Sequence, residues 1–293
     1  MKQVSILIPV YNDDVTGQVS LLRNQCMAID GLQWEIVVSD DGSTDESLGR
    51  NRSINAYPCC RLIERGRNYS RASNRNFLAR EASYDTLIYI DSGLKPNPRF
   101  VENYVENIGH ASVVCGGIAV DEEHTDLSNL RCRNELRAER RFTVAVRTAE
   151  PYKNFHSGNF MARRQVVLDN PFREDITTYG YEDTLFGKTL EERRVSIAHI
   201  DNPVLFVRFE NNTRFLEKTD EAIGTLYAFR YDLEGYSPLL SLVNRLSACS
   251  LLWLPRLLFA LCGKVMRANL RGHNPSLRVF SLYRACMLAR RFK

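Results

Sequence analysis

Residues 4–14, with the sequence VSILIPVYNDD, join an apolar run to a polar end. The run from Val4 to Val10 is rich in β-branched residues, which favours a buried strand. A helical pattern follows over residues 15–27, and a second apolar run occupies residues 34–38. Strands that alternate with helices in this way predict βαβ units and a mostly parallel sheet.

Two further apolar runs, residues 60–63 and 86–90, flank a helical pattern at residues 71–82. Polar residues follow three of the four predicted strands: Asn12 and Asp13, then Asp40 and Asp41, then Asp91. Ligands of parallel α/β sheets bind at the carboxyl ends of the strands. We therefore expect the binding site at these acidic strand ends.

The composition fits a globular protein of 293 residues, with 44% hydrophobic and 25% charged residues. These values indicate neither disorder nor a polytopic membrane protein. The eight cysteines form no CxxC pair and no zinc-finger spacing, so we expect reduced thiols. The first residues show no secretion signal, and the expected location is the cytoplasm.

The net charge of +4 is the sum of two unlike regions. Glu234 is the last acidic residue, and residues 235–293 contain 10 of the 39 Lys and Arg residues. The preceding part therefore carries 39 − 10 = 29 basic against 35 acidic residues, a charge of −6, and the tail carries +10. This asymmetry predicts an anionic partner, either a membrane or nucleic acid. No nucleic-acid-binding module accompanies the charge, which favours the membrane.

Two segments, SILIPVYN at residues 5–12 and VVSDDGSTD at residues 37–45, resemble the opening motifs of family 2 glycosyltransferases. An isolated acidic cluster would be explained as a turn with a helix cap. The resemblance implies instead an α/β protein of the GT-A fold, with a Rossmann-like, mostly parallel nucleotide-diphospho-sugar transferase sheet. It also implies that Pro9 and Tyr11 flank a nucleobase and that Asp40 or Asp41 bonds its imide. A uracil imide N–H needs a buried acceptor, so the expected donor is a UDP-sugar.

The segment NYSRASNRN at residues 68–76 resembles the family's next motif, whose arginine lies near the nucleotide. Arg71 and Arg75 are four residues apart, on one face of the predicted helix. Guanidinium groups suit a diphosphate because they form paired hydrogen bonds. The alternative is that these arginines belong to a solvated basic face.

The segment YIDSGLKPNP at residues 89–98 stands where the family has its D-x-D motif. The resemblance implies that Asp91 and Ser92 lie at the donor diphosphate and that Asp91 anchors a Mn²⁺ or Mg²⁺ ion. Such ions prefer oxygen ligands and offset the charge on a departing nucleotide. Gly93 replaces the second carboxylate of the motif, so the sequence leaves metal dependence open.

Residues 154–164 (NFHSGNFMARR) and 180–183 (GYED) resemble the acceptor half of the same family. The resemblance makes Asp183 the base that deprotonates the acceptor hydroxyl, with Glu182 orienting the acceptor. A helix cap with an acidic first turn is compatible with that role. The family's metal-binding histidine aligns with Phe206 or Val207, and we expect His199, inside a predicted strand, to be structural.

We expect a GT-A domain over residues 1–234, with a donor-nucleotide half at 1–118 and an acceptor half at 119–234. One charged helical segment, residues 121–147, joins the halves. Residues 235–293 form a basic amphipathic helical tail. On a helix, Arg256, Lys264, Arg267 and Arg271 fall within an arc of about 80° and Leu258, Leu261, Val265 and Met266 face elsewhere, which predicts contact of residues 245–293 with an anionic membrane. A terminal helix packed on the body is the alternative.

The sequence thus predicts an inverting glycosyltransferase of surface-polysaccharide synthesis, peripheral at the inner face of the cell membrane. It would use a nucleotide sugar and a glycan or lipid-linked acceptor. The alternative is a degenerate or metal-independent accessory module that binds a nucleotide sugar without turnover, which Gly93 favours. An NAD-dependent oxidoreductase is disfavoured because no GxGxxG follows the first strand.

Overall fold

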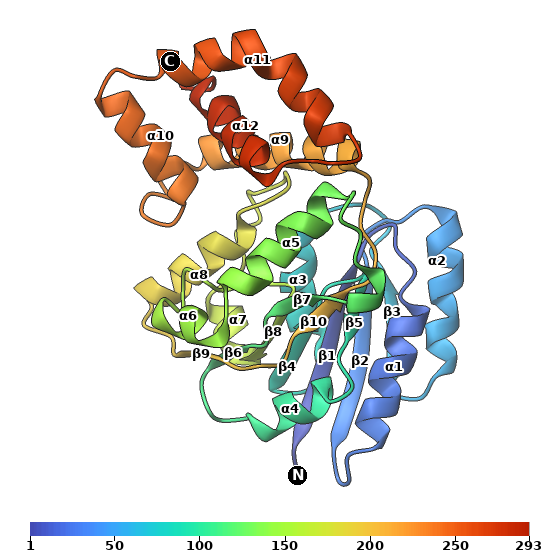
Figure 1. The fold of residues 1–293 in the computed structure, drawn as a ribbon. Helices are drawn as coiled ribbons and strands as arrows, with labels where there is room; N and C mark the ends of the chain where they lie inside the picture. Colours follow the sequence, from blue (N-terminus) through green and yellow to red (C-terminus); the bar gives the residue numbers. More distant parts are fainter. Residues whose placement is uncertain (293) are drawn as a thin grey trace. The chain divides into compact units, whose positions relative to one another are not determined.

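The central sheet of the protein has helices on both faces (Figure 1). The structure, a computed structural model, describes residues 1–292. Within that range seven strands form the sheet in the order β3-β2-β1-β4-β8-β6-β9. The strands are β1 (Gln3–Val10), β2 (Gln33–Asp40), β3 (Cys60–Glu64), β4 (Thr86–Ile90), β6 (Val113–Cys115), β8 (Asn159–Arg163) and β9 (Ile197–His199).

The strand directions confirm the predicted mostly parallel sheet. Strand β1 pairs in parallel with β2 and β4, β2 with β3, and β6 with β9. Only β8 runs antiparallel, between β4 and β6, among the strands of this sheet in residues 1–292. A small second sheet contains β5 (Leu94–Pro96), β10 (Val204–Phe206) and β7 (Ile118–Val120).

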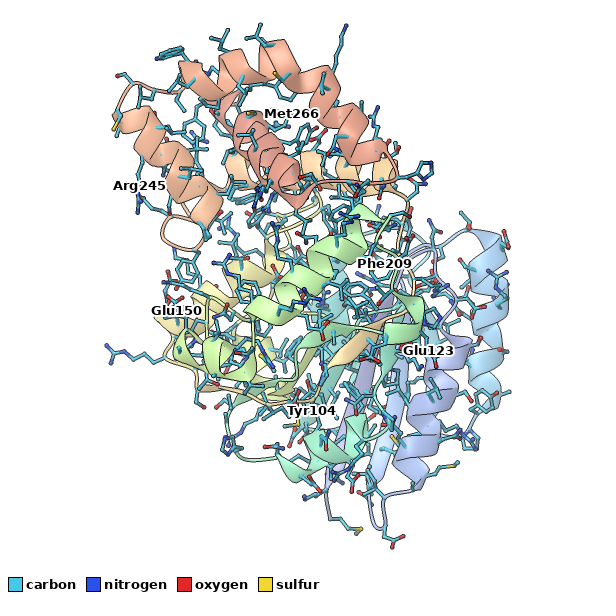
Figure 2. All side chains as sticks on the ribbon, in the orientation of Figure 1. Tyr104, Glu123, Glu150, Phe209, Arg245 and Met266 are labelled. Atoms are coloured by element: carbon cyan, nitrogen blue, oxygen red, sulfur yellow. The ribbon has the colours of Figure 1, made fainter. Side chains whose placement is uncertain are left out.

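The alternation of side chains along β1 explains the two helical layers. Val4, Ile6, Ile8 and Val10 pack with α1 (Thr16–Met27) and α4 (Phe100–Glu106). Leu7 belongs to the opposite face, which packs against α3 (Arg71–Glu81), α7 (Arg164–Asp169) and α8 (Glu182–Glu192). Tyr104 of α4 is labelled in Figure 2 and is fully buried. Helix α2 (Asp45–Asn51) and the 3₁₀ turn Arg52–Ala56 connect β2 to β3.

The segment expected to be helical over residues 121–147 is helical in three separate pieces. The structure has a 3₁₀ turn at Glu122–His124, helix α5 at Leu130–Arg141 and helix α6 at Val144–Ala149. Thr143 caps α6 by accepting a hydrogen bond from Val146 N. A capping hydroxyl competes with the helical backbone for its hydrogen bonds, which favours a break at this point.

The chain divides into two compact units. Unit 1 comprises residues 1–121, 142–177 and 182–207, and unit 2 comprises residues 122–141, 178–181 and 208–293. The boundary expected at residue 234 therefore falls inside unit 2. Unit 2 contains α5, α9 (Asn212–Ala228), α10 (Pro238–Ala248), α11 (Trp253–Arg271) and α12 (Leu277–Ala289), so the helical extension is larger than the predicted tail.

The core of unit 2 lies between α5, α9, α11 and α12. Met266 and Leu270 of α11 pack with Phe280 and Tyr283 of α12 and with Phe215 of α9 (Figure 2 labels Met266). Asp220 of α9 accepts two hydrogen bonds from the Tyr283 hydroxyl, at 2.7 and 2.9 Å, and burial raises the pKa of Tyr283 to about 12.

Two of the four residues in the expected basic stripe of the tail contact other parts of unit 2. Arg256 donates to the backbone carbonyls of Ala289 and Phe292. Arg267 lies over the rings of Phe259 and Tyr283. Lys264 and Arg271 are exposed, and so are the apolar residues Leu261 and Val265. Part of the basic face therefore contacts residues of α11 itself, of α12 and of the segment after α12.

Candidate nucleotide and acceptor site

The register of the sheet brings the predicted site residues to one edge. Val10, the last residue of β1, pairs with Asp40, the last residue of β2. Ile90 at the end of β4 pairs with Asn159, and because β8 is antiparallel, its first residue lies at that same edge. The segments around Tyr11, Asp41, Asp91 and residues 156–158 therefore leave or enter the sheet together.

The loops that follow β1 and β2 are bonded to each other. Asn12 N donates to Ser43 Oγ at 2.7 Å, and Thr44 N donates to Asn12 Oδ1 at 2.9 Å. Gly42 has φ of +82°, and a Cβ at this position would lie 2.5 Å from the carbonyl carbon of Arg67. Only glycine allows the loop after β3 to approach so closely. The loops that follow β1, β2 and β3 thus contact one another at this edge of the sheet.

Of the two carboxylate oxygens of Asp40, one accepts hydrogen bonds and the other accepts none within residues 1–292. Its Oδ1 accepts hydrogen bonds from Gly42 N at 3.1 Å and Ser43 N at 2.7 Å. Its Oδ2 is buried and accepts no hydrogen bond from residues 1–292. An unsatisfied buried carboxylate oxygen is costly, and a ligand that donates to it removes that cost.

Asp41, in contrast, is fully engaged within the protein. Its Oδ1 pairs with Arg65 at 3.0 Å, and its Oδ2 accepts from Tyr69 N and Ser70 N, both at 3.1 Å. Burial raises the pKa of Asp41, against the lowering effect of these donors. Asp41 therefore holds the 65–70 loop, and Arg65 in turn stacks on the Tyr69 ring at 4.2 Å.

Arg75 is 2% exposed and lies among three carboxylates. Its Nη2 is 2.6 Å from Asp91 Oδ1, and its Nη1 is 3.6 Å from Glu182 Oε1. Asp183 also acts on it electrostatically, and together these carboxylates raise the pKa of Arg75 although burial opposes the charge. The guanidinium joins the end of β4 to the first turn of α8, so it is a bridge in this structure rather than a solvated basic face.

The remaining predicted residues lie at the same edge with different exposure. Tyr11 is 52% exposed, and Arg71, the first residue of α3, is also exposed. Pro9 and Ser92 are half-buried. Asp183 is half-buried, and its Oδ1 accepts a hydrogen bond from Thr184 N at 2.7 Å. The other Asp183 oxygen accepts no hydrogen bond within the part of the chain that the structure describes.

His156 joins this edge although sequence reasoning did not single it out. Its Nδ1 accepts a hydrogen bond from Gly158 N at 3.0 Å. A Cβ built on Gly158 would lie 3.1 Å from His156 Nδ1 and 3.3 Å from Asp91 Oδ2, so the exposed imidazole and Asp91 flank the same glycine. A neutral imidazole that accepts at Nδ1 carries its proton on Nε2 and can donate from there.

His199 is structural, as predicted. It is buried, its Nε2 lies 3.0 Å from the carbonyl oxygen of Pro151, and its Nδ1 lies 3.1 Å from Arg147 Nη1. Burial lowers the pKa of His199. Both ring nitrogens are therefore engaged by the protein.

The residues around Asp91 offer a divalent cation one anchor. Asp91 Oδ1 is committed to Arg75, and Gly93 supplies no carboxylate. Asp91 Oδ2 remains, and its side chain is 28% exposed. Mg²⁺ is often held by one or two carboxylates together with substrate phosphates and water. The donor set fits a cation that arrives with a diphosphate.

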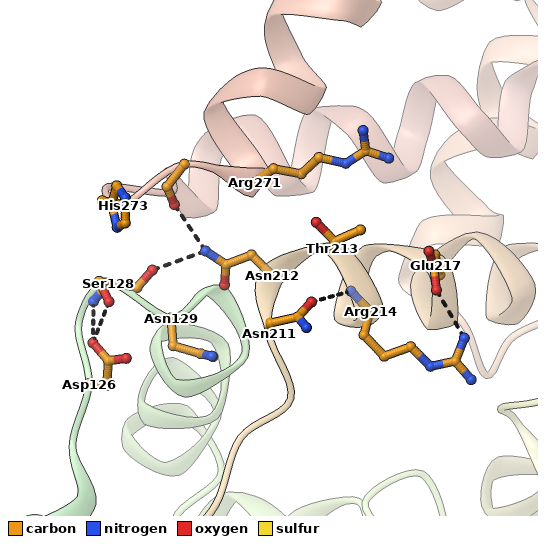
Figure 3. A pocket seen from close by; sticks show the side chains of 11 residues that line it. Asp126, Ser128, Asn129, Asn211, Asn212, Thr213, Arg214, Glu217, Arg271 and His273 are labelled. Atoms are coloured by element: carbon orange, nitrogen blue, oxygen red, sulfur yellow. Dashed lines mark hydrogen bonds and ion pairs between the residues drawn. The ribbon is translucent and has the colours of Figure 1, made fainter.

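A separate pocket of about 590 Å³ lies within unit 2 (Figure 3). Asn212 donates from its side chain to the carbonyl oxygens of Ser128 and Gly272, which ties three segments of its wall together. Its charged lining residues are Asp126, Arg214, Glu217 and Arg271, and His273 lies among them. None of the site residues predicted from the sequence lines it, so it is distinct from the strand-end site.

The family model described as "Glycosyl transferase family 2" matches residues 5–170. An undecaprenyl-phosphate 4-deoxy-4-formamido-L-arabinose transferase of Pectobacterium carotovorum is 30% identical over 127 residues, which is 42% of this chain and 38% of that protein. The chain thus matches less than half the length of this relative.

Two solved structures are similar in fold. A mannosyltransferase from Pyrobaculum calidifontis, in complex with GDP-Man and Mn²⁺, has a TM-score of 0.61 and 17% identity, over 98% of this chain and 85% of that one. Glucosyl-3-phosphoglycerate synthase from Mycobacterium tuberculosis, in complex with Mn²⁺, UDP and glucosyl-3-phosphoglycerate, has a TM-score of 0.51 and 17% identity, over 78% and 79%. These similarities confirm the expected GT-A fold.

Proposed function

Because this chain belongs to glycosyl transferase family 2, we propose that it transfers a sugar from a nucleotide-sugar donor to a glycan or lipid-linked acceptor. One observation carries the proposal: a buried, unpartnered acceptor at Asp40 and a carboxylate at Asp183 with an open oxygen both belong to the strand-end site. The first suits a nucleobase, and the second suits a hydroxyl that must lose its proton.

Asp40 Oδ2 selects the base by its hydrogen-bonding pattern. Uracil and guanine present an N–H on the edge that faces this oxygen, whereas adenine and cytosine present an acceptor nitrogen there. Hydrogen bonds to an ionised acceptor are stronger than neutral ones. Both structural neighbours were solved with a nucleotide of the first kind, GDP-Man or UDP, which supports a UDP-sugar with GDP-sugars as the second choice.

The transfer itself needs a base at the acceptor and a departing diphosphate. Asp183 takes the proton of the acceptor hydroxyl as the acceptor oxygen forms its bond to the anomeric carbon. The bond from that carbon to the diphosphate oxygen breaks in the same displacement, which inverts the configuration. Glu182, held by Arg75, orients the acceptor, while Pro9, Tyr11, Arg71 and Ser92 contact the donor.

A bound Mn²⁺ or Mg²⁺ would stabilise the negative charge of the departing diphosphate. Asp91 Oδ2 would hold it, with the other ligands supplied by the diphosphate and water. Mn²⁺ in both neighbours supports this assignment. A single protein carboxylate makes the cation bind weakly before the donor arrives.

The test is a transfer assay with UDP-, GDP-, ADP- and CDP-sugars, each with and without Mn²⁺. We expect Asp183→Asn to lower kcat/KM by about 100-fold or more, the range of general-base catalysis. Asp169→Asn is the matched control, because Asp169 is exposed and lies at the end of α7. Full activity of Asp183→Asn would refute the proposed base.

Given this acceptor, we propose that the protein is cytoplasmic and binds peripherally to the inner face of the membrane. The relative from Pectobacterium is named for transfer to undecaprenyl phosphate, which supports a lipid-linked acceptor. The ten basic residues after Glu234 are compatible with an anionic membrane surface.

Gly93 favours a second candidate, an accessory module that binds a nucleotide sugar without turnover. Calorimetry separates the two candidates. The module would bind UDP with no gain from Mn²⁺ and would transfer sugar to none of the acceptors tried. The transferase would show tighter UDP binding with Mn²⁺ and turnover that depends on Asp183.

A further inference from the structure

Helix α11 exposes a continuous apolar face. Five of its side chains are 44–73% exposed: Trp253, Leu254, Leu257, Leu261 and Val265. At 100° per residue they fall within an arc of about 120°. The opposite side of the helix, with Met266 and Leu270, packs into the core of unit 2. This exposure is therefore a property of one face and not of scattered surface residues.

Two apolar side chains before the helix are also exposed. Leu251, in the connection before α11, is 36% exposed, and Leu242 of α10 is 48% exposed. No single helix within residues 1–292 is long and apolar enough to cross a membrane, and α10 and α11 pass that test only as a pair bent by 114°.

The charge around this face has one sign. Residues 235–293 contain no Asp or Glu. Lys264 lies inside the arc of the apolar side chains, and Arg271 lies at the end of the same face. Arg245 of α10 is exposed as well (Figure 2). Long basic side chains beside apolar ones can keep their charge in a polar layer while their stems lie in an apolar one.

Two kinds of partner can cover an exposed apolar helix face. A second copy of the chain, docked face to face, would bring two basic surfaces without acidic residues together, and like charges oppose such contact. An anionic lipid surface supplies both the apolar layer and the complementary charge. Trp253 fits this partner, because tryptophan is enriched where apolar and polar layers meet.

We propose that the apolar face of α11 enters the interfacial layer of an anionic bilayer, with Lys264 and Arg271 on the headgroups. The basic stripe expected from the sequence is not the contact surface, since Arg256 and Arg267 are engaged inside unit 2. This inference rests on the proposed function and deepens it by assigning the surface that would contact the membrane in which a lipid-linked acceptor resides.

The experiment measures co-sedimentation of the full chain with vesicles of phosphatidylcholine alone or with 30% phosphatidylglycerol. We expect binding to the anionic vesicles, and a loss of at least about ten-fold in the partition coefficient for Leu261→Glu and for Val265→Glu. Both side chains are at least 70% exposed, so the variants should melt as the wild type does. Leu21→Glu, at a 44% exposed leucine on α1, is the matched control and should bind normally.

Trp253 gives a second readout. Its fluorescence should be quenched by brominated lipids when anionic vesicles are added, in a Trp34→Phe background that leaves Trp253 as the one tryptophan. Unchanged binding of Leu261→Glu and Val265→Glu, or an unquenched Trp253, would overturn the proposal. So would a lipid-free dimer that Leu261→Glu dissociates, or a wild type that resists carbonate extraction.

The experiments can refute the proposed function and the membrane contact independently of each other. Asp183→Asn should bind vesicles as the wild type does, because Asp183 plays no part in lipid contact. Leu261→Glu should keep its affinity for UDP, which the strand-end site determines. Loss of transfer with intact vesicle binding would count against the transferase alone.

Discussion

At the scale of single residues, the adjacent carboxylates Asp40 and Asp41 have different proposed roles. Asp40 is proposed to bind the nucleobase, whereas Asp41 holds the 65–70 loop. Asp40→Asn should weaken UDP binding about ten-fold to a hundred-fold, the value of one hydrogen bond to a charged group. The new amide must use its oxygen for Gly42 N and Ser43 N, which turns its NH₂ group toward the N–H of the base. Calorimetry with UDP measures the affinity, and the melting temperature should change little.

Asp41→Asn is the comparison for that prediction. Asp41 bonds Arg65 and two backbone N–H groups, so its replacement should lower the melting temperature more than the Asp40 change does. Equal effects of both changes on stability and on affinity would contradict the assignment. The sequence could place both carboxylates at the strand end, but only the positions of the 65–70 loop and of Gly42 distinguish them.

His156 is predicted to donate a hydrogen bond from Nε2 to the donor diphosphate. His156→Ala should lower kcat/KM about ten-fold, a modest loss for one neutral donor. His156→Gln should recover part of it, because the amide can donate from a similar place. Initial rates at varied donor concentration provide the measurement. Equal losses in both variants would mean that the imidazole acts by another route.

No spacing rule could have identified His156. Its role depends on the tight turn at Gly158, whose amide fixes the Nδ1 atom, and on the pairing of β4 with an antiparallel β8. The sequence marked the surrounding motif, but not which of its side chains lies beside Asp91.

At the scale of elements, Arg75 links α3, the end of β4 and the start of α8. Arg75→Met should lower the free energy of unfolding by about 3 kcal/mol or more, since removal of one partner leaves buried charge uncompensated. Arg80→Met, at an exposed position in the last turn of α3, should change it by about 0.5 kcal/mol or less. Urea unfolding followed by circular dichroism gives both values. A similar effect of the two changes would argue against the bridge.

The elements of unit 1 were more predictable than those that follow. The strand predicted at residues 86–90 matches β4, because five apolar or β-branched residues between turns have few alternatives. The segment expected to be helical over residues 121–147 is helical, but its breaks were not predicted, since a run of charged residues is compatible with helix throughout and shows no interruption. The break before α6 is capped locally by Thr143, whereas the start of α5 depends on α9, where Asn212 Oδ1 accepts a hydrogen bond from Leu130 N.

At the scale of the whole molecule, a half-buried ion cluster makes stability depend on pH. Glu210 is 2.6 Å from Arg131 of α5 and 2.9 Å from Lys218 of α9. Burial alone would raise the pKa of Glu210, but these cations lower it from 4.5 to about 2. Its contribution, on the order of 3 kcal/mol, is complete above the ordinary pKa and is lost as the pH falls toward 2.

The variant Glu210→Gln tests this pH dependence through its difference from the wild type in unfolding free energy. The gap in unfolding free energy between wild type and variant should be largest at pH 7 and shrink between pH 4.5 and 2, because protonation removes the same charge from the wild type. Urea titrations at several pH values provide the gap. Glu217→Gln, at an exposed ion pair with Arg214, should leave a gap near zero throughout. A constant gap for Glu210→Gln would contradict the shift.

The two-unit organisation was the least predictable feature. The charge distribution predicted a boundary at Glu234, the last acidic residue. Unit 2, however, also includes residues 122–141 and 178–181 from the middle of the chain. Such recruitment depends on long-range packing, for example of Leu130 with Phe215 and Tyr283, which no local pattern reveals. The contacts of Arg256 and Arg267 were unpredictable for a similar reason, because most of their partners lie in α12 or just after it.

The three carboxylates around Arg75 would couple binding of the proposed donor to the uptake of cations. Asp91, Glu182 and Asp183 against one guanidinium give −3 + 1 = −2 charges before any ligand arrives. A nucleoside diphosphate adds negative charge to this edge, so cations must enter with it to keep the site close to neutral. The affinity for the nucleotide would then rise with the concentration of free divalent cation, although the protein itself has little affinity for that cation.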